Sequence, residues 1–110
     1  MEARSLESLV LKHFDFLSQD YGFEYDKSLN CYFKDRLKIE VQHENGELNL
    51  TFLTNDKSIK FTDLMSQVLQ KKFTYPEYFS SWVLSMGDVD SRLAYDAKLI
   101  KEHTQELFAI

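Results

Sequence analysis

The chain has few of the residues that interrupt or crosslink a fold. Its 110 residues include one proline, three glycines and a single cysteine, Cys31. One cysteine cannot form an internal disulfide, and so little glycine and proline leaves almost no room for linkers or long irregular loops. We therefore expect a single domain over residues 1–110, of a size that can bury its own core.

Long apolar runs are also missing. No run approaches the roughly 20 residues that a membrane-spanning helix requires. Met1 to Ser5 are polar and are not followed by the apolar core of a signal peptide. Apolar residues at 44% and aromatic residues at 15% exclude a disordered chain. These features predict a cytoplasmic protein with no membrane partner.

Potential metal ligands are sparse. His13, His43 and His103 are separated by 30 and 60 residues, so no two of them have the i, i+3 or i+4 spacing of metal sites on helices. Cys31 has no second cysteine to complete a ligand set. His13 falls on the apolar stripe of the first predicted helix, which favours a hydrogen-bonded core residue over a ligand. We expect neither a metal nor another cofactor.

Motifs of catalysis are absent as well. No G-x-S-x-G, P-loop or G-x-G-x-x-G string occurs, and Gly22, Gly46 and Gly87 are too far apart to form a phosphate-binding loop. Asp88 and Asp90 could be a carboxylate pair, but acids two residues apart at a predicted helix start are more typical of a cap. We expect no catalytic residues and no enzymatic activity.

Basic residues are outnumbered by acids, 13 to 18, which gives a formal net charge of −5. No Lys or Arg occurs between Lys12 and Lys27, nor between Ile39 and Asp56. Nucleic acids are disfavoured as partners, because binding them requires Lys and Arg to neutralise phosphates. A basic protein partner is favoured, chiefly through faster association. The alternative is that the charge only keeps a small domain soluble.

The segment from Leu37 to Thr54 encodes a β-hairpin. Apolar and polar residues alternate on both sides of Asn45-Gly46, the dipeptide that a two-residue type I′ turn favours. Folding about this turn sets Val41 opposite Leu50, with the apolar face directed inward. The other face carries Glu40, Gln42, Glu44, Glu47, Asn49 and Thr51. All of these except Thr51 are candidate partner-binding residues.

The pattern before and around the hairpin indicates one helix and further strands. Apolar residues at three- and four-residue spacing predict a helix from about Ser5 to Asp20, ended by Gly22. Short alternating segments then indicate an antiparallel meander of four to five strands. Those outside the hairpin are Phe23 to Asp26, Cys31 to Lys34 and Ser58 to Phe61.

Three helices are expected after the sheet. They run from a Thr62-Asp63 cap to about Lys71, from a capping box at Thr74-Tyr75-Pro76-Glu77 to Gly87, and from Asp88 or Asp90 to the end. Because the hairpin has only one apolar face, the helices should lie on one side of the sheet. The sequence thus predicts an α+β fold: an N-terminal helix, an antiparallel meander and three C-terminal helices on one face.

An aromatic group precedes the last helix: Phe73, Tyr75, Tyr78, Phe79 and Trp82. On a helix beginning at Thr74, Tyr78 and Trp82 would lie on one face, four residues apart. The group is either a core layer against the last helix or a partly exposed patch of the kind enriched at binding hot spots. Tyr78 and Trp82 are therefore further candidate partner-binding residues.

Four segments carry a resemblance to a known class: the Tyr21-Gly22-Phe23 helix exit, the Leu37 to Val41 strand, the Gly46-Glu47-Leu48 return strand and the Thr62-Asp63-Leu64 helix start. In layout, size and acidity the chain resembles the small bacterial immunity proteins of polymorphic toxin and contact-dependent inhibition systems. This resemblance implies a toxin inhibitor that binds a cognate toxin domain tightly and occludes it. A basic toxin that acts on nucleic acid would attract such an acidic inhibitor to its substrate-binding surface.

Two alternatives remain open. The chain could be a structural adaptor or subunit that docks through its aromatic group. It could instead be a small-ligand-binding protein or an enzyme, with a pocket between sheet and helices lined by His13, His43 and Tyr95.

Overall fold

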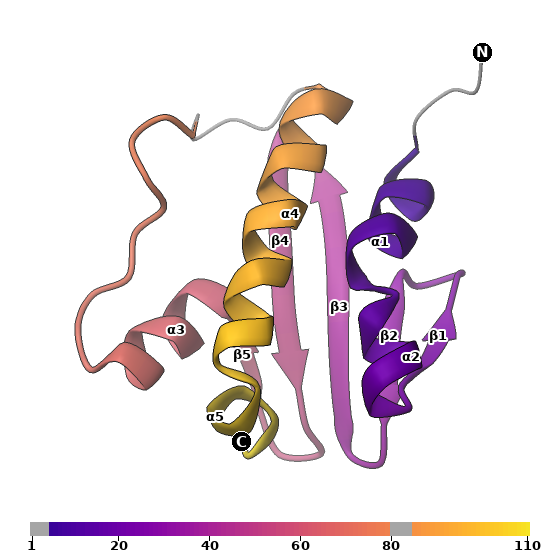
Figure 1. Ribbon diagram of the computed structural model, residues 1–110, viewed down its shortest axis with the longest axis vertical. Helices are drawn as coiled ribbons and strands as arrows, with labels where there is room; N and C mark the ends of the chain where they lie inside the picture. Colours follow the sequence, from indigo (N-terminus) through magenta and orange to yellow (C-terminus); the bar gives the residue numbers. More distant parts are fainter. Residues whose placement is uncertain (1–4, 80–84) are drawn as a thin grey trace.

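The computed structural model describes residues 5–79 and 85–110 and has an α+β fold. Its five strands form one antiparallel sheet in the order β1-β2-β3-β4-β5, so each strand pairs with its neighbour in sequence (Figure 1). The strands are β1 (Glu24–Asp26), β2 (Cys31–Lys34), β3 (Leu37–Glu44), β4 (Glu47–Leu53) and β5 (Ser58–Lys60). The helices are α1 (Leu6–Phe14), α2 (Phe16–Tyr21), α3 (Phe61–Leu69), α4 (Met86–Glu102) and α5 (Thr104–Phe108).

The hairpin of β3 and β4 confirms the predicted register. Asn45 and Gly46 form the turn with φ of 53° and 78°, the positive values that a type I′ turn requires. Val41 pairs with Leu50 and Ile39 with Phe52, and all four side chains are buried. The alternation of apolar and polar residues fixes this register, because a slip by one residue would turn the apolar set to solvent.

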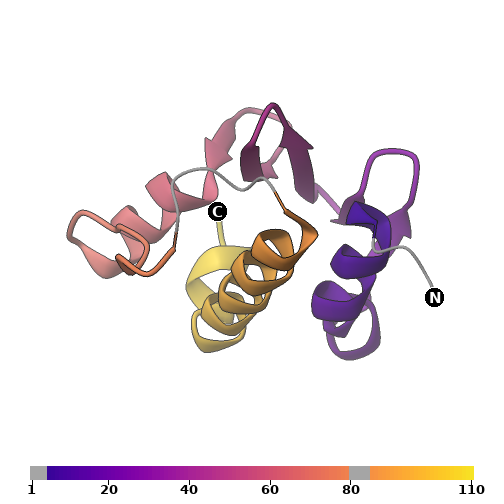
Figure 2. The same ribbon diagram turned by 90° about the horizontal axis from the view of Figure 1, so that it is seen from above.

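The helices cover one face of this sheet, as predicted. Seen from above, α1 with α2 and α4 with α5 lie on the same side of β3 and β4, while α3 lies beside the β5 edge (Figure 2). The core fills the space between these layers and includes Phe14, Leu17, Tyr32, Ile39, Phe52, Phe61, Met65, Leu93, Ile100 and Leu107. No helix of the described residues covers the opposite face of β3 and β4 (Figure 2).

The predicted N-terminal helix is divided in two at Asp15. Ser5 begins α1 with a reciprocal capping box, in which its side chain and that of Ser8 each accept a backbone N–H. Gly22 ends α2 with φ of 76°, and its N–H donates to the carbonyls of Leu17 and Ser18. Glycine adopts this left-handed conformation without steric cost, so the predicted helix end is confirmed.

The predicted helix from Thr74 to Gly87 is wrong over the part that the structure describes, because residues 74–79 are not helical. Tertiary contacts decide the conformation here: Ser66 Oγ accepts the N–H of Phe73 at 2.9 Å, and the Tyr75 hydroxyl donates to Asp96 at 2.6 Å. Pro76 instead begins a turn that the N–H of Phe79 closes. These bonds outweigh the local capping signal.

Two predicted helix starts are also corrected. The side chain of Ser85 caps α4 by accepting the N–H of Asp88, so neither Asp88 nor Asp90 is the cap and Gly87 lies in the first turn. Helix α3 begins at Phe61, before the predicted Thr62-Asp63 cap, with Lys60 as an N-cap that makes no side-chain bond. No helix within residues 5–79 and 85–110 is long and apolar enough to cross a membrane.

Candidate functional site

The structure brings five of the predicted site residues together on the sheet surface that faces away from the helices. Pairing sets Glu44 opposite Glu47 and Gln42 opposite Asn49, and Glu40 is next along β3. Gln42, Glu44 and Glu47 are exposed, while Glu40 and Asn49 are half-buried. We call these five residues the acidic face. The two-residue period of the strands places them on one surface, as the sequence predicted.

Glu44 and Glu47 are two acids at directly paired positions of the sheet. The two carboxylates extend from directly paired positions beside the turn, and like charges at such positions destabilise a sheet. A cationic group from a partner would relieve this repulsion. The pair is therefore better suited to binding a positive surface than to stabilising the free fold.

The far end of the acidic face is partly neutralised. Lys60 of β5 pairs with Thr51, which in turn pairs with Glu40, and Lys38 lies two residues before Glu40 on the same side of β3. Gln42 Nε2 also donates to Glu40 Oε1 at 2.9 Å. The stretch without Lys or Arg in the sequence thus has cations at neighbouring positions of the sheet, whereas Glu44 and Glu47 form no ion pair with a residue of 5–79 or 85–110.

A shallow groove of about 430 Å³ borders the acidic face where β2 stops and β3 continues. The carbonyl of Asn30 accepts the N–H of Val41 at 3.1 Å, next to the first residue pair of β2. The groove is lined by Leu6, by the turn residues Ser28 to Asn30, and by the β3 segment from Glu40 to Glu44. Leu29 is 57% exposed, so an apolar anchor site adjoins the acid cluster.

Sequence reasoning missed Leu29 as a candidate for this surface. Leu29 lies in the turn between β1 and β2, and a large apolar side chain in such a turn is a usable signal. Its place beside the acidic face could not be read from the sequence, because it depends on β2 being shorter than β3.

The structure places Phe79 against α4, and Tyr75 lines a small cavity together with Asn49 of the acidic face. The Tyr78 side chain is 76% exposed and its ring packs against Phe79 at 4.7 Å between centroids. Phe79 in turn contacts Tyr95 of α4 at 5.4 Å, on the helical side of the sheet. Trp82 lies outside the described residues. Tyr75 and Phe79 thus pack against the last long helix, and Tyr78 extends into solvent.

A buried carboxyl group that the sequence analysis overlooked anchors the aromatic segment. Asp96 on α4 is 1% exposed and accepts the hydroxyl of Tyr75 at 2.6 Å. The guanidinium carbon of Arg92 lies 3.7 Å from the centre of the Tyr75 ring, a stacked cation–π geometry. Burial raises the pKa of Asp96 to about 7 and also raises the pKa of Tyr75. Asp96 lies three residues after Leu93 and four before Ile100, so all three share one side of the helix. This spacing was the signal in the sequence for the burial of Asp96.

His13, His43 and Tyr95, which one alternative placed around a single pocket, have different neighbours among the described residues. His13 Nε2 lies 2.5 Å from Asp90 Oδ1, in the contact between α1 and α4, as a hydrogen-bonded residue. That bond and one from Lys12 lower the pKa of Asp90. His43 lines the groove beside Leu29, and Tyr95 packs on the aromatic segment.

Other chemistry-bearing side chains are dispersed. Cys31 is buried beneath the outer sheet surface, and burial raises the pKa of its thiol, which disfavours the nucleophilic thiolate. Within residues 5–79 and 85–110, no group of three or more His, Cys, Asp or Glu side chains is arranged to hold a metal ion.

Comparison with known proteins adds no relative. The chain matches no protein-family model, no curated protein and no solved structure.

Proposed function

We propose that this protein binds a basic protein partner through its acidic face, as an immunity protein that occludes a cognate toxin domain. The observation that supports this proposal is the facing pair of Glu44 and Glu47 on a sheet surface that no described helix covers. The free protein gains no stability from that pair. A cationic partner would gain binding free energy from the negative charge of this pair.

The groove beside the acidic face supports the same proposal. Leu29 offers an exposed apolar contact adjoining Glu44 and Glu40. Stable interfaces combine an apolar centre with a polar rim, and charge complementarity mainly accelerates association and selects the partner. The groove would supply the apolar contact, and the acidic residues would attract the partner and speed its association.

A growth-rescue assay tests this function. The toxin candidate encoded next to the gene for this protein is expressed alone and together with it. We expect the wild-type protein to restore growth, and the double variant Glu44→Lys/Glu47→Lys to restore it much less, because charge reversal repels a basic partner.

A matched control is Glu102→Lys/Glu106→Lys, which makes the same change of net charge at exposed positions of α4 and α5. This control should rescue growth as the wild type does. Equal rescue by the two double variants would contradict the proposed surface, and no rescue by the wild type would contradict the function with that toxin.

A structural adaptor remains the second candidate, because of one specific observation. Tyr78 exposes 76% of its surface although its ring contacts that of Phe79 in a tilted arrangement. Exposed tyrosines are common anchors of interfaces. Loss of an assembly on Tyr78→Ala, with full activity of the Glu44→Lys/Glu47→Lys variant, would favour this alternative.

A further inference from the structure

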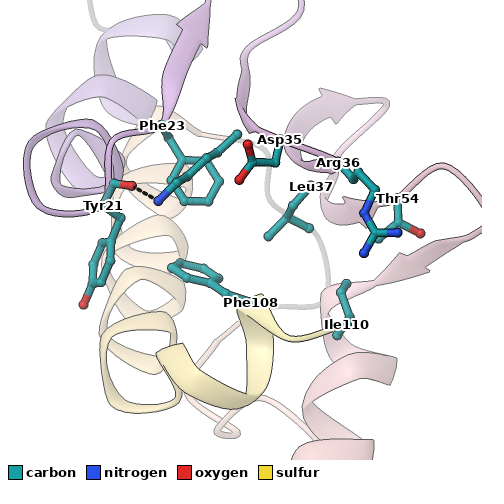
Figure 3. A pocket seen from close by; sticks show the side chains of 9 residues that line it. Tyr21, Phe23, Asp35, Arg36, Leu37, Thr54, Phe108 and Ile110 are labelled. Atoms are coloured by element: carbon teal, nitrogen blue, oxygen red, sulfur yellow. Dashed lines mark hydrogen bonds between the residues drawn. The ribbon is translucent and has the colours of Figure 1, made fainter.

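A second cavity lies at the opposite end of β3 and β4 from Glu44 and Glu47. It has a volume of about 330 Å³ and is formed where the end of α2, the β2–β3 turn, the residue after β4 and the end of α5 meet (Figure 3). Nine residues line it: Tyr21, Phe23, Lys34, Asp35, Arg36, Leu37, Thr54, Phe108 and Ile110. This volume lies within the range of small-molecule sites, which begins at roughly 300 Å³.

Aromatic and aliphatic side chains form the floor of the cavity. The Phe108 ring lies 5.3 Å from that of Phe23 and 5.4 Å from that of Tyr21, measured between centroids. Leu37 and Ile110 continue this apolar surface on the other side of Phe108 (Figure 3). Such a floor favours a flat aryl or branched alkyl group.

The local sequence dictates this arrangement. Gly22 ends α2 in the left-handed conformation, and the N–H of Phe23 then donates to the Leu17 carbonyl at 3.0 Å. This turn directs Phe23 back towards α5. The turn at Asp35 and Arg36, where Asp35 has a φ of 54°, places the residues before and after it at the rim of the cavity.

Two cations and one acid stand around the floor. Lys34 Nζ donates to the carbonyl of Tyr21 at 2.6 Å and lies 6.0 Å from the centre of the Phe23 ring. The Arg36 guanidinium lies near Thr54, and Asp35 lies between Phe23 and Arg36 (Figure 3). The cavity rim therefore places two side-chain cations beside one side-chain carboxylate, although the whole chain carries −5.

Both cations retain hydrogen-bonding capacity for an anion. The Lys34 ammonium has three donors, of which the bond to Tyr21 uses one. Arg36 is exposed, and a guanidinium presents a planar set of donors that matches a carboxylate. Asp35 would repel an anion, so a ligand is expected to approach from the Lys34 or Arg36 side.

We infer that this cavity binds a small organic acid, with one carboxylate held by Lys34 or Arg36 and an aryl or branched alkyl body on Phe23, Phe108 and Leu37. An uncharged ligand would leave the cations unused, and a purely inorganic anion would leave the apolar floor empty. This inference does not rest on the proposed function, because the cavity and the acidic face lie at opposite ends of the hairpin.

Titration of the ¹⁵N-labelled protein with 4-phenylbutyrate, followed by amide NMR shifts, tests this site. We expect saturable shifts confined to residues around the cavity, with a dissociation constant of about 1 mM or below, as expected for so small a ligand. The neutral analogue 4-phenylbutyramide should bind at least about fivefold more weakly, because it lacks the charge-assisted bonds.

Substitutions of the two cations test which of them binds the carboxylate of the ligand. Arg36→Gln or Lys34→Gln, whichever removes the cation that holds the carboxylate, should weaken 4-phenylbutyrate binding by about three- to tenfold, and the double variant should abolish it. Lys71→Gln, which removes an exposed cation after α3, should leave it unchanged. Because Lys34 bonds to Tyr21, unchanged dispersion of the spectrum shows that its variant is folded. Shifts away from the cavity, no saturation, or equal binding of acid and amide would overturn the inference.

Discussion

At the residue scale, Asp96 shows how a single buried group can control a whole segment. Its carboxyl group accepts a hydrogen bond from the Tyr75 hydroxyl, and the Arg92 guanidinium lies over the Tyr75 ring. The segment from Phe73 to Phe79 has no regular secondary structure, so these contacts with α4 replace the backbone bonds that a helix would supply. The ionisation of Asp96 should therefore affect stability.

The pH dependence of stability gives the first prediction. The pKa of Asp96 is about 7 in the folded protein, and it is about 4 in an unfolded chain. Between these values the folded state holds a proton that the unfolded state has released. The contribution of Asp96 to stability is therefore complete below about pH 4 and is lost as the pH rises towards 7.

Asp96→Asn keeps an oxygen acceptor for Tyr75 and removes this dependence. We expect the variant to be more stable than the wild type at pH 8 by up to a few kcal/mol, since each pKa unit corresponds to about 1.4 kcal/mol. The gain should vanish near pH 4. Urea denaturation at several pH values measures it. Tyr75→Phe, which removes the bond that favours the ionised carboxylate, should steepen the loss. Parallel curves for wild type and Asp96→Asn would contradict this account.

At the element scale, the hairpin is the part of the fold that the sequence specifies most completely. Alternation along β3 and β4, and a dipeptide suited to positive φ, act within neighbouring residues. The register and the composition of the acidic face followed from them. The prediction of a helix from Thr74 to Gly87 is wrong for the opposite reason. Its capping box is a local signal, but Phe73 and Tyr75 bond to Ser66 and Asp96, which only the tertiary fold brings near.

The same contrast explains what could be predicted of the candidate sites. Residues that share a strand, such as Glu40 and Glu44, could be placed on one surface from their spacing. Lys60 could not be placed beside them without the pairing of β5 with β4. The groove at Leu29 depends on the unequal lengths of β2 and β3, and the cavity at Phe108 on the return of α5 to the sheet.

Substitution within the hairpin gives the second prediction. Val41 is 1% exposed, and Val41→Asp places an unpaired carboxylate in the core. The cost is several kcal/mol against a total stability of about 5–15 kcal/mol, so the domain should unfold or become marginal. Gln42→Asp, one residue along on the exposed surface, should retain nearly full stability. Thermal unfolding by circular dichroism compares them, and similar midpoints for both variants would refute the inward direction of Val41.

At the scale of the whole molecule, the charges and the layers divide the protein into distinct surfaces. The helices cover one side of the sheet, which leaves the acidic face on the other (Figure 2). Tyr78 lies on the helical side, through its contact with Phe79 and Tyr95. The cavity lined by Lys34, Arg36 and Phe108 lies at the end of the sheet remote from Glu44. A partner that binds the acidic face therefore need not compete with a ligand in the cavity.

The central claim is that Glu44 and Glu47 attract a basic partner. Its most direct test is the association rate constant with the cognate toxin domain, measured at low and at physiological salt for the wild type, Glu44→Gln/Glu47→Gln and the control Glu102→Gln/Glu106→Gln. Long-range attraction acts over a Debye length of about 30 Å at 0.01 M salt and about 8 Å at 0.15 M. We predict that the Glu44→Gln/Glu47→Gln variant associates several-fold more slowly at low salt, that the difference shrinks at physiological salt, and that the control matches the wild type. Association of this variant at the wild-type rate at low salt would contradict the claim.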